Sequence, residues 1–338
     1  MRAFFHPAEF RHDPKLRFAR GALRPAQEVP ERLSRFVHAA RDLGFTLLEP
    51  EDRGRAFIEA VHTPEYVRFL ETAYARWKEM PADWGEEVMS SVFVREPNAR
   101  RGILAEAAYH IADGASPIGA GSWEAIYASA QSAIAAAHAI LAGDFHAYAI
   151  CRPPGHHARV DAAGGFCYLN NAAIAAQILS QTYPRVLILD TDLHHGQGTQ
   201  EIFYARDDVY YLSIHADPTN FYPAVAGFAE ETGSGRGKGY NLNLPMPHHS
   251  PETVFFDRLA KALTVIHAYQ PDALVLSLGF DVYEKDPQAL VAVTSGGFQR
   301  LGATLASLKK PVLVVQEGGY CLEGLEENAR RFFTGLLS

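Results

Sequence analysis

The chain has 338 residues, of which 48% are hydrophobic and 21% charged, as is usual for a globular protein with a large core. Its net charge of −8 argues against a nucleic-acid-binding surface, and no apolar run approaches the roughly 18 residues of a membrane span. Three cysteines are too few for a disulfide framework, so we expect a cytoplasmic protein. From its charge and its apolar runs, we expect it to bind neither nucleic acid nor membrane.

The first part of the chain is expected to be mainly helical. Apolar residues at helical spacing predict helices over Pro30–Leu43, Pro64–Lys78 and Trp123–Leu141. Residues 79–122, between the last two, mix proline, glycine, tryptophan and charge without clear periodicity. A segment of that length is usually functional or an insert.

From about residue 148 the pattern predicts a parallel sheet. Apolar runs typical of strands buried on both faces occur at Tyr148–Cys151, Val186–Leu189, Val209–Ser213, Ala273–Leu278 and Val312–Val315. Helical segments alternate with them at Asn171–Ser180, Pro251–Tyr269 and Gly297–Leu308. Neither a repeat nor a linker interrupts this pattern, so residues 1–338 are expected to form one α/β domain.

Polar side chains gather just after the strands. They occupy Arg152–His157, Asp190–Gly196, Gly279–Asp281 and Gln316–Tyr320. Ligands of open α/β sheets bind outside the carboxyl ends of the strands, so these four segments should converge on one crevice.

A metal site is one function that this crevice could have. Asp192 and His194 are two residues apart, so in an extended segment both side chains point to one side. Asp281, which follows another strand, could complete a set of three ligands. Three protein ligands leave a position open for water or substrate, as in catalytic zinc sites. Asp-x-His alone is a weak signal, and the other strand ends strengthen it.

Two adjacent histidines and a tyrosine could supply proton transfer. The turn Pro153-Pro154-Gly155 should aim His156 and His157 at one place, and Asp190 could orient one imidazole. Tyr320 follows two glycines and could donate a hydrogen bond to an oxyanion. The alternatives for these residues are a helix-start histidine pair with one core histidine, and a half-buried tyrosine at a strand end.

Taken together, the motifs resemble the histone deacetylase superfamily. The segments that carry the resemblance are Arg152–His157, Gly164–Asn171, Asp190–Gly198, Ser277–Asp281 and Glu317–Tyr320, in family order over essentially the whole chain. The resemblance implies the arginase/deacetylase-like α/β fold, a central parallel sheet flanked by helices. It also implies zinc at Asp192, His194 and Asp281, His156 and His157 as general base and acid, Tyr320 beside the zinc, and Asp190 orienting His156.

Within that superfamily the chain is most similar to bacterial acetylpolyamine amidohydrolases. The segments that support this are Phe69–Ala73, Arg76–Lys78, Thr199–Tyr204 and Gly227–Gly233. The implied activity is zinc-dependent hydrolysis of N-acetyl amides of polyamines or similar small cationic amines. A protein acetyl-lysine deacetylase of the histone type is the alternative, and a catalytically silent acetyl-amine binding module is a weaker one. Iron(II) is possible in place of zinc.

The resemblance implies further site residues. A structural potassium ion would involve Asp190, Asp192, His194, Ser213 and Ile214, and a second monovalent site would lie around Phe203, Arg206, Val209 and Tyr240. The substrate channel would be lined by Gly165, Phe166 and Tyr222, although Phe166 taken alone fits a core position. Gln197 stands where many eukaryotic members have an aspartate that pairs with the second histidine, so the pKa of His157 should be lower than with an aspartate partner.

The same resemblance gives residues 79–122 a role as an insert that narrows the entrance and joins two copies of the chain. Its apolar residues Trp84, Val88, Met89, Val92, Phe93 and Val94 would be costly to leave in water. A two-fold homodimer is the commonest way to bury such a surface. Glu106 and Asp113, in this insert, could attract a distal ammonium group, with solvated surface charge as the alternative.

Overall fold

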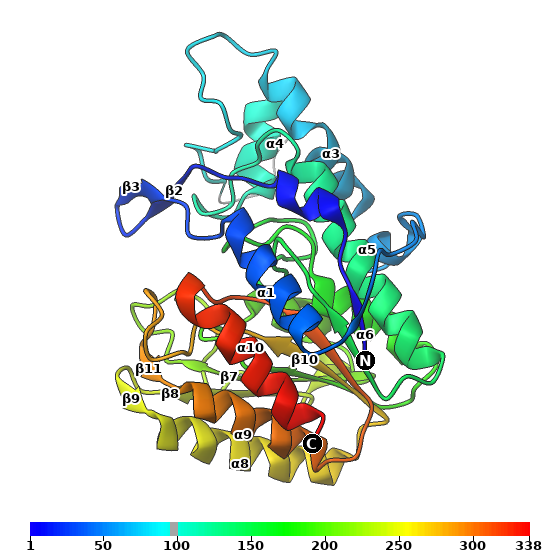
Figure 1. The fold of residues 1–338 in the computed structure, drawn as a ribbon. Coiled ribbons are helices and arrows are strands. Elements are labelled where there is room, and N and C mark those ends of the chain that lie inside the picture. The colour runs from blue at the N-terminus through cyan, green and yellow to red at the C-terminus, as the bar shows by residue number, and fades with distance from the viewer. Residues whose placement is uncertain (95–100) are drawn as a thin grey trace.

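The predicted apolar runs form the centre of one eight-stranded parallel sheet (Figure 1). In the computed structural model, which describes residues 1–94 and 101–338, the spatial order is β4 (Thr46–Leu48), β1 (Arg2–Phe4), β5 (His146–Ala149), β12 (Val312–Gln316), β10 (Ala273–Leu278), β6 (Val186–Asp190), β7 (Val209–Ala216) and β8 (Asn241–Met246). The five predicted strands are confirmed, with small shifts at their ends. The sequence pattern did not predict β1, β4 and β8.

Helices cover both faces of the sheet. The helices of the described residues are α1 (Pro30–Asp42), α2 (Ala56–Glu59), α3 (Pro64–Trp77), α4 (Ile103–His110), α5 (Ser122–Leu141), α6 (Asn171–Ser180), α7 (Gln197–Phe203), α8 (Glu252–Tyr269), α9 (Ser295–Ala306) and α10 (Leu322–Leu336), of which α3 and α4 project beyond the sheet. The six predicted helices are confirmed. Short strands form two further pairs, β2 (Leu16–Ala19) with β3 (Ala22–Pro25) and β9 (Ser250–Pro251) with β11 (Val291–Ala292).

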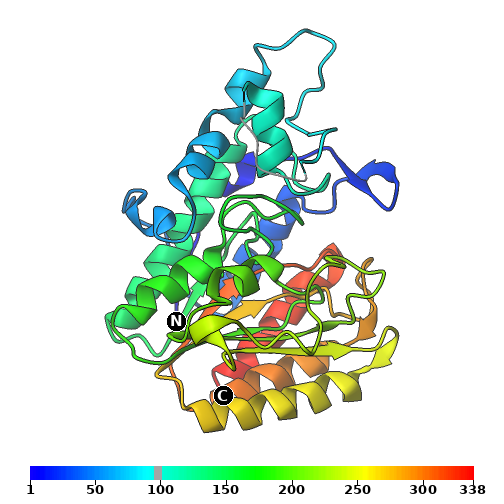
Figure 2. The same ribbon diagram turned by 180° about the vertical axis from the view of Figure 1, so that it is seen from behind.

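The alternation of side chains along each strand divides the core into two layers. In β6, Val186 and Ile188 join the cluster that packs under α3, α5 and α6. Leu187 and Leu189 join the opposite cluster, under α1, α8, α9 and α10. Figures 1 and 2 show α5 and α6 on one side of the sheet and α8, α9 and α10 on the other, with α3 beyond the sheet. Burial on both faces explains why the strands are continuously apolar.

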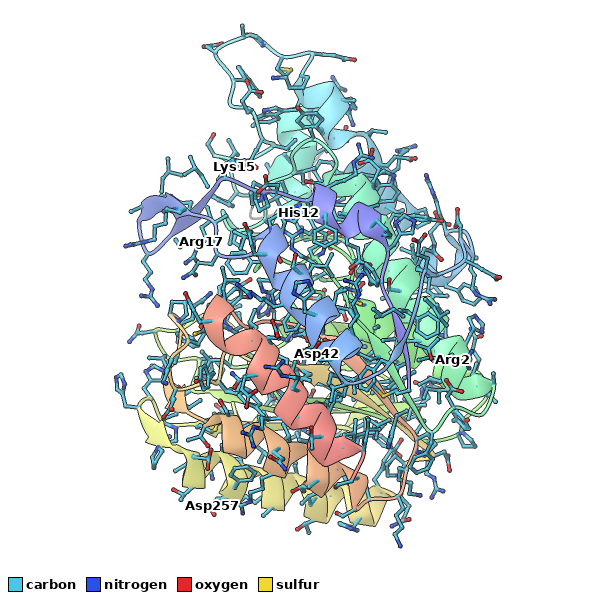
Figure 3. The ribbon with its side chains drawn as sticks, viewed as in Figure 1. Arg2, His12, Lys15, Arg17, Asp42 and Asp257 are labelled. Atoms are coloured by element: carbon cyan, nitrogen blue, oxygen red, sulfur yellow. The ribbon has the colours of Figure 1, made fainter. Side chains whose placement is uncertain are left out.

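The helices that flank the sheet are also joined to one another at the surface. Asp42 at the end of α1 accepts a hydrogen bond of 2.7 Å from Arg330 of α10. Figure 3 labels Asp42 on α1, beside the C-terminal helix. Within the described residues, no helix is long and apolar enough to span a membrane.

The described part of segment 79–122 contains more regular structure than its sequence predicted. It contains α4, and Val88 pairs with Ile118 in an antiparallel bridge. Val88 is fully buried, so it is not available to a partner, and Trp84 packs on Trp77 at a ring distance of 4.8 Å. Phe93, in contrast, is 55% exposed.

The strand register brings the polar segments together. Asp190 at the end of β6 is level with Ser277 of β10 and with Ser213 of β7. Leu278 of β10 is level with Gln316 of β12. The segments that follow these strands therefore leave the same edge of the sheet, as the position of a ligand crevice requires.

Candidate active site

Asp192, His194 and Asp281 meet just beyond β6 and β10. One ligand atom from each lies within 4.8 Å of the other two, and all three residues are buried. His194 Nδ1 is 3.2 Å from Asp192 Oδ1 and 3.0 Å from Asp281 Oδ2. The three side chains thus point at one place, although they come from two separate segments of the chain.

The charges at this place favour a cation. Burial raises the pKa of Asp281, and the nearby carboxylate of Asp192 raises it further. Burial opposes the charged form of His194, but both carboxylates outweigh that effect and raise its pKa to about 9. Two buried carboxylates facing one imidazole therefore fit a divalent ion, which would compensate their mutual repulsion.

Glycines leave room for this set of ligands. Gly318 donates its N–H to Asp192 Oδ2 at 2.8 Å. A Cβ at Gly318 would lie 2.6 Å from the Oδ2 atoms of both Asp192 and Asp281. Only a glycine lets the backbone after β12 approach the carboxylates so closely.

His156 is held by a carboxylate. Its Nδ1 lies 3.0 Å from Asp190 Oδ2, which also accepts a hydrogen bond of 3.0 Å from the Tyr211 hydroxyl. Burial opposes the imidazolium, but Asp190 and Asp192 outweigh it and raise the pKa of His156 to about 10. Glu317 fixes the backbone here, since its Oε2 accepts the N–H groups of Gly155 and His156 at 2.8 and 3.1 Å.

His157 has a neutral partner and lines the cavity. Its Nδ1 is 2.6 Å from Gln197 Oε1, while Gln197 Nε2 donates to the Tyr222 hydroxyl at 3.3 Å. An acceptor at Nδ1 assigns the proton to that nitrogen and leaves Nε2 as a base. Burial, followed by the charges of His156 and His194, lowers the pKa of His157 well below its usual value. The pKa values of the two adjacent histidines are therefore shifted in opposite directions.

The loop that carries Tyr320 is clamped from two sides. Asp286 Oδ2 accepts the N–H of Tyr320 at 2.6 Å. Arg32 of α1 donates to the carbonyl oxygens of Gly319 and Glu317, both at 2.6 Å, and its guanidinium lies 5.0 Å from the centre of the Tyr320 ring. Burial raises the pKa of Tyr320 well above 10, so the hydroxyl stays a hydrogen-bond donor.

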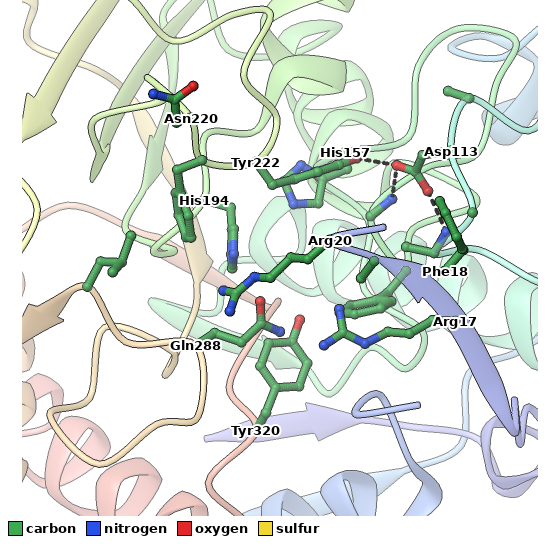
Figure 4. Close-up of a pocket in the computed structure, with 18 of the residues that line it drawn as sticks. Arg17, Phe18, Arg20, Asp113, His157, His194, Asn220, Tyr222, Gln288 and Tyr320 are labelled. Atoms are coloured by element: carbon green, nitrogen blue, oxygen red, sulfur yellow. Dashed lines mark hydrogen bonds between the residues drawn. The ribbon is translucent and has the colours of Figure 1, made fainter. Parts of the chain in front are cut away.

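A cavity of about 700 Å³ opens over these groups (Figure 4). His157, His194 and Tyr320 reach it from the sheet edge, and Phe166 and Tyr222 form part of its wall. Its other lining residues are Arg17, Phe18, Ala19, Arg20, Phe93, Ala112, Asp113, Gly114, Ala115, Gly165, Asn220, Phe221, His248, Gln288 and Leu290. A size of this order suits a small molecule.

The two expected entrance carboxylates already have partners. Asp113 lines the cavity, but its Oδ2 accepts the Tyr222 hydroxyl at 2.7 Å and the Gly165 N–H at 3.0 Å. It therefore shapes the wall. Glu106 lies outside the described cavity lining and receives two hydrogen bonds of 2.6 Å from Arg76. Both carboxylates therefore have partners within the chain, and their role in attracting an ammonium group stays a prediction.

Of the residues suggested for monovalent ions, the first group lies near the ligands and the second lies toward the opposite end of β7. Ser213 is paired in register with Asp190, and Ile214 follows it in β7. The second group, Phe203, Arg206, Val209 and Tyr240, surrounds the turn between α7 and β7 and the start of β8. Arg206 there pairs with Asp208 at 2.6 Å.

Sequence reasoning missed several residues around the site. Arg32, Asp286 and Glu317 position its loops, and Arg17 and Arg20 line its cavity. Most of them are far from the motifs in the sequence, and only Glu317 lies within one. The dipeptide Arg20-Gly21 between two short extended segments was the one local signal for the hairpin that carries the cavity arginines.

Comparisons with known proteins agree with this geometry. A family model described as "Histone deacetylase domain" matches residues 26–336. The chain is 62% identical to an acetylpolyamine amidohydrolase of Burkholderia pseudomallei, and the match covers 99% of this chain and 98% of that one. It is 40% identical to an acetylpolyamine amidohydrolase of Mycoplana ramosa, and that match covers 97% of this chain and 98% of the relative. A crystal structure of the Burkholderia protein superposes with a TM-score of 0.98 over 99% of this chain and 98% of that chain. The HD domain of HDA15 superposes with a TM-score of 0.81 at 29% identity, covering 99% and 89%.

Proposed function

The chain belongs to the histone deacetylase family, and we propose that it is a metal-dependent amidohydrolase that releases acetate from small N-acetylated amines. The observation that carries the proposal is the convergence of three metal-ligand side chains, two adjacent histidines with different hydrogen-bond partners, and Tyr320 beside one cavity. A catalytically silent binding module would have no use for all six groups.

Asp192, His194 and Asp281 would hold the metal, for which Zn²⁺ is our first choice and Fe²⁺ the alternative. When bound, such an ion acts as a Lewis acid toward the amide carbonyl and acidifies a water molecule. We further propose a structural K⁺ near Asp190, Asp192, His194, Ser213 and Ile214, supported by the strand register that pairs Asp190 with Ser213.

The protein groups then divide the proton transfers. Neutral His157, whose Nε2 is free, suits removal of a proton from water. Charged His156 suits donation of a proton to the departing amine, either directly or through His157. Asp190 keeps His156 oriented and stabilises its charge. The Tyr320 hydroxyl donates to the acetyl oxygen as negative charge develops on it.

An acetylated polyamine is the proposed substrate class, on the strength of the relatives' names and the size of the cavity. The alternative is an acetyl-lysine side chain of a protein.

The width of the entrance, to which segment 79–122 contributes, affects the choice between these two substrates. Val92, Phe93 and Val94 are exposed at the cavity rim or next to it, and we propose that a second copy of the chain covers them. Such a homodimer would narrow the entrance.

Two measurements test these proposals. Acetate release is compared for N-acetylputrescine and an acetyl-lysine peptide, with the chelated protein and with Zn²⁺ restored. We expect Zn²⁺-dependent release, faster from the small amide. No release from either substrate would contradict the function, and preference for the peptide would favour the alternative.

Light scattering should show a dimer that Phe93→Asp weakens. Val225→Asp, which changes an exposed apolar residue outside the insert, is the control and should leave the dimer unchanged. A wild-type monomer at micromolar concentration would contradict the interface.

A further inference from the structure

A row of hydrogen bonds joins His157 to segment 79–122. His157 Nδ1 lies 2.6 Å from Gln197 Oε1, and Gln197 Nε2 lies 3.3 Å from the Tyr222 hydroxyl. That hydroxyl lies 2.7 Å from Asp113 Oδ2, and Figure 4 shows it directed at Asp113. The row thus begins at the proposed base and ends at a carboxylate to which the hydrolysis described above gives no part.

Asp113, at the far end of this row, is placed to accept hydrogen bonds. Its Oδ1 accepts the N–H of Ala115 at 2.8 Å, and its Oδ2 accepts the N–H of Gly165 at 3.0 Å. Burial raises the pKa of Asp113, and the hydrogen bonds that it accepts oppose that shift. An N–H group can only donate, so both carboxylate oxygens act as acceptors. The single proton of the Tyr222 hydroxyl therefore goes to Asp113, in a charge-assisted hydrogen bond.

The direction of this first hydrogen bond determines the next two. Because its proton is directed at Asp113, the Tyr222 oxygen accepts from its other neighbour, Gln197. An amide has one donor end and one acceptor end, so a Gln197 that donates from Nε2 to Tyr222 presents Oε1 to His157. An acceptor at Nδ1 keeps the ring proton on that nitrogen and leaves Nε2 as the base.

The reversed amide would give the wrong tautomer. With Gln197 turned over, its NH₂ group would donate to His157 Nδ1, and the ring proton would move to Nε2. A protonated Nε2 has no lone pair with which to take a proton from water. Gln197 and His157 are both buried, so solvent does not readily replace a lost partner. A carboxylate beside His157 would accept in either orientation, whereas a glutamine accepts in only one.

We propose that Asp113 is a positioning residue for the reaction: through Tyr222 and Gln197 it selects the tautomer of His157 that acts as the base. The inference rests on the proposed function, in which His157 takes a proton from water. It requires no contact between Asp113 and the substrate. It also gives segment 79–122 a part in the reaction itself, in addition to its part in the entrance.

Asp113→Asn tests the inference with N-butylacetamide, a neutral substrate on which attraction of an ammonium group has no effect. The new NH₂ group can turn the Tyr222 hydroxyl away, toward Gln197. We expect kcat to fall at least about tenfold, out of the roughly 10²–10⁴-fold contribution of a general base, with little change in KM. The matched control is Asp161→Asn, because Asp161 also accepts from a tyrosine hydroxyl, that of Tyr109 at 2.9 Å, but lies outside the described cavity lining.

Two further variants separate positioning from a change in the cavity wall. Tyr222→Phe removes the hydroxyl and leaves Asp113 in place, so it should lower kcat as Asp113→Asn does. Gln197→Glu gives His157 a partner that accepts in either orientation, so in this background Asp113→Asn should no longer lower kcat. A merely structural role of Asp113 would lower kcat equally in both backgrounds, and that result would overturn the inference.

The tautomer itself is measured by ¹⁵N NMR of the histidine rings in the Zn²⁺-loaded protein, with His157→Gln to identify the signals of His157. This measurement stands even if no acetate is released, so it separates the inference from the proposed function. We expect the proton on Nδ1 in wild type and in Asp161→Asn, and a large share on Nε2 in Asp113→Asn. The same tautomer in wild type and Asp113→Asn would overturn the inference.

Discussion

Arg32 links the stability of the fold to the position of Tyr320, and its replacement separates the two effects. The guanidinium is fully buried and donates to two carbonyl oxygens of the Tyr320 loop and to Glu28 Oε1 at 2.7 Å. Arg32→Met would leave these acceptors buried without their donor. Breaking a buried charge pair costs about 3–5 kcal/mol. Glu28 still contacts Arg152 at 2.8 Å, so we expect the lower end of that range.

Catalysis should respond differently from stability. Arg32→Lys keeps a charge for Glu28 but cannot serve both carbonyls, because an ammonium group lacks the fork of a guanidinium. We expect Lys to restore part of the stability in urea unfolding, while kcat stays about tenfold low and KM changes little. The metal content should be unaffected. The control, Arg35→Met, removes a half-exposed arginine of the same helix and should change stability by less than about 0.5 kcal/mol. A Lys variant with the wild-type kcat would refute the positioning role.

Two other predictions concern single side chains. Tyr320→Phe should keep its metal and lower kcat about 10²–10³-fold, the effect of removing one oxyanion donor. Turnover like that of the wild type would mean that Tyr320 has only a structural role. Burial lowers the pKa of His62 to about 4, and its Nε2 accepts the Asn170 N–H at 2.9 Å. The unfolded chain, with a histidine pKa near 6.5, then binds the proton more readily, so this stability is complete above about pH 6.5 and is lost as pH falls toward 4. Urea unfolding of His62→Gln should show a smaller loss between pH 7 and pH 5 than the wild type; an equal loss would argue against His62.

Continuous apolar runs were predictable from the sequence, whereas short or interrupted elements were not, and the 15-residue helix α10 was also missed. β10 and α6 have their predicted bounds, because continuous burial gives an unbroken apolar run. β1 and β4 have three residues each, too few to show a period, and β8 contains Pro245 and two asparagines. In segment 79–122, the sequence pattern did not predict α4, because its eight residues lack a strong polar face.

In the site, too, some features could be predicted from the sequence and others could not. Strand ends carrying Asp192, His194 and Asp281 could be expected to meet, because parallel strands end at one edge of the sheet. The contacts of Asp113 and Glu106 could not be foreseen. Each depends on a partner, Tyr222 or Arg76, that only the folded chain brings within hydrogen-bond distance.

The metal content of one pair of variants tests the central claim most directly. Asp281 follows the end of β10 and Asp272 precedes its start, where it pairs with Arg185 at the surface. After chelation and reconstitution with Zn²⁺, elemental analysis and acetate release are measured on wild type, Asp281→Ala and Asp272→Ala. Our account predicts one tightly bound ion and full activity in the wild type and in Asp272→Ala, and the loss of both in Asp281→Ala. A full complement of metal in Asp281→Ala would contradict it.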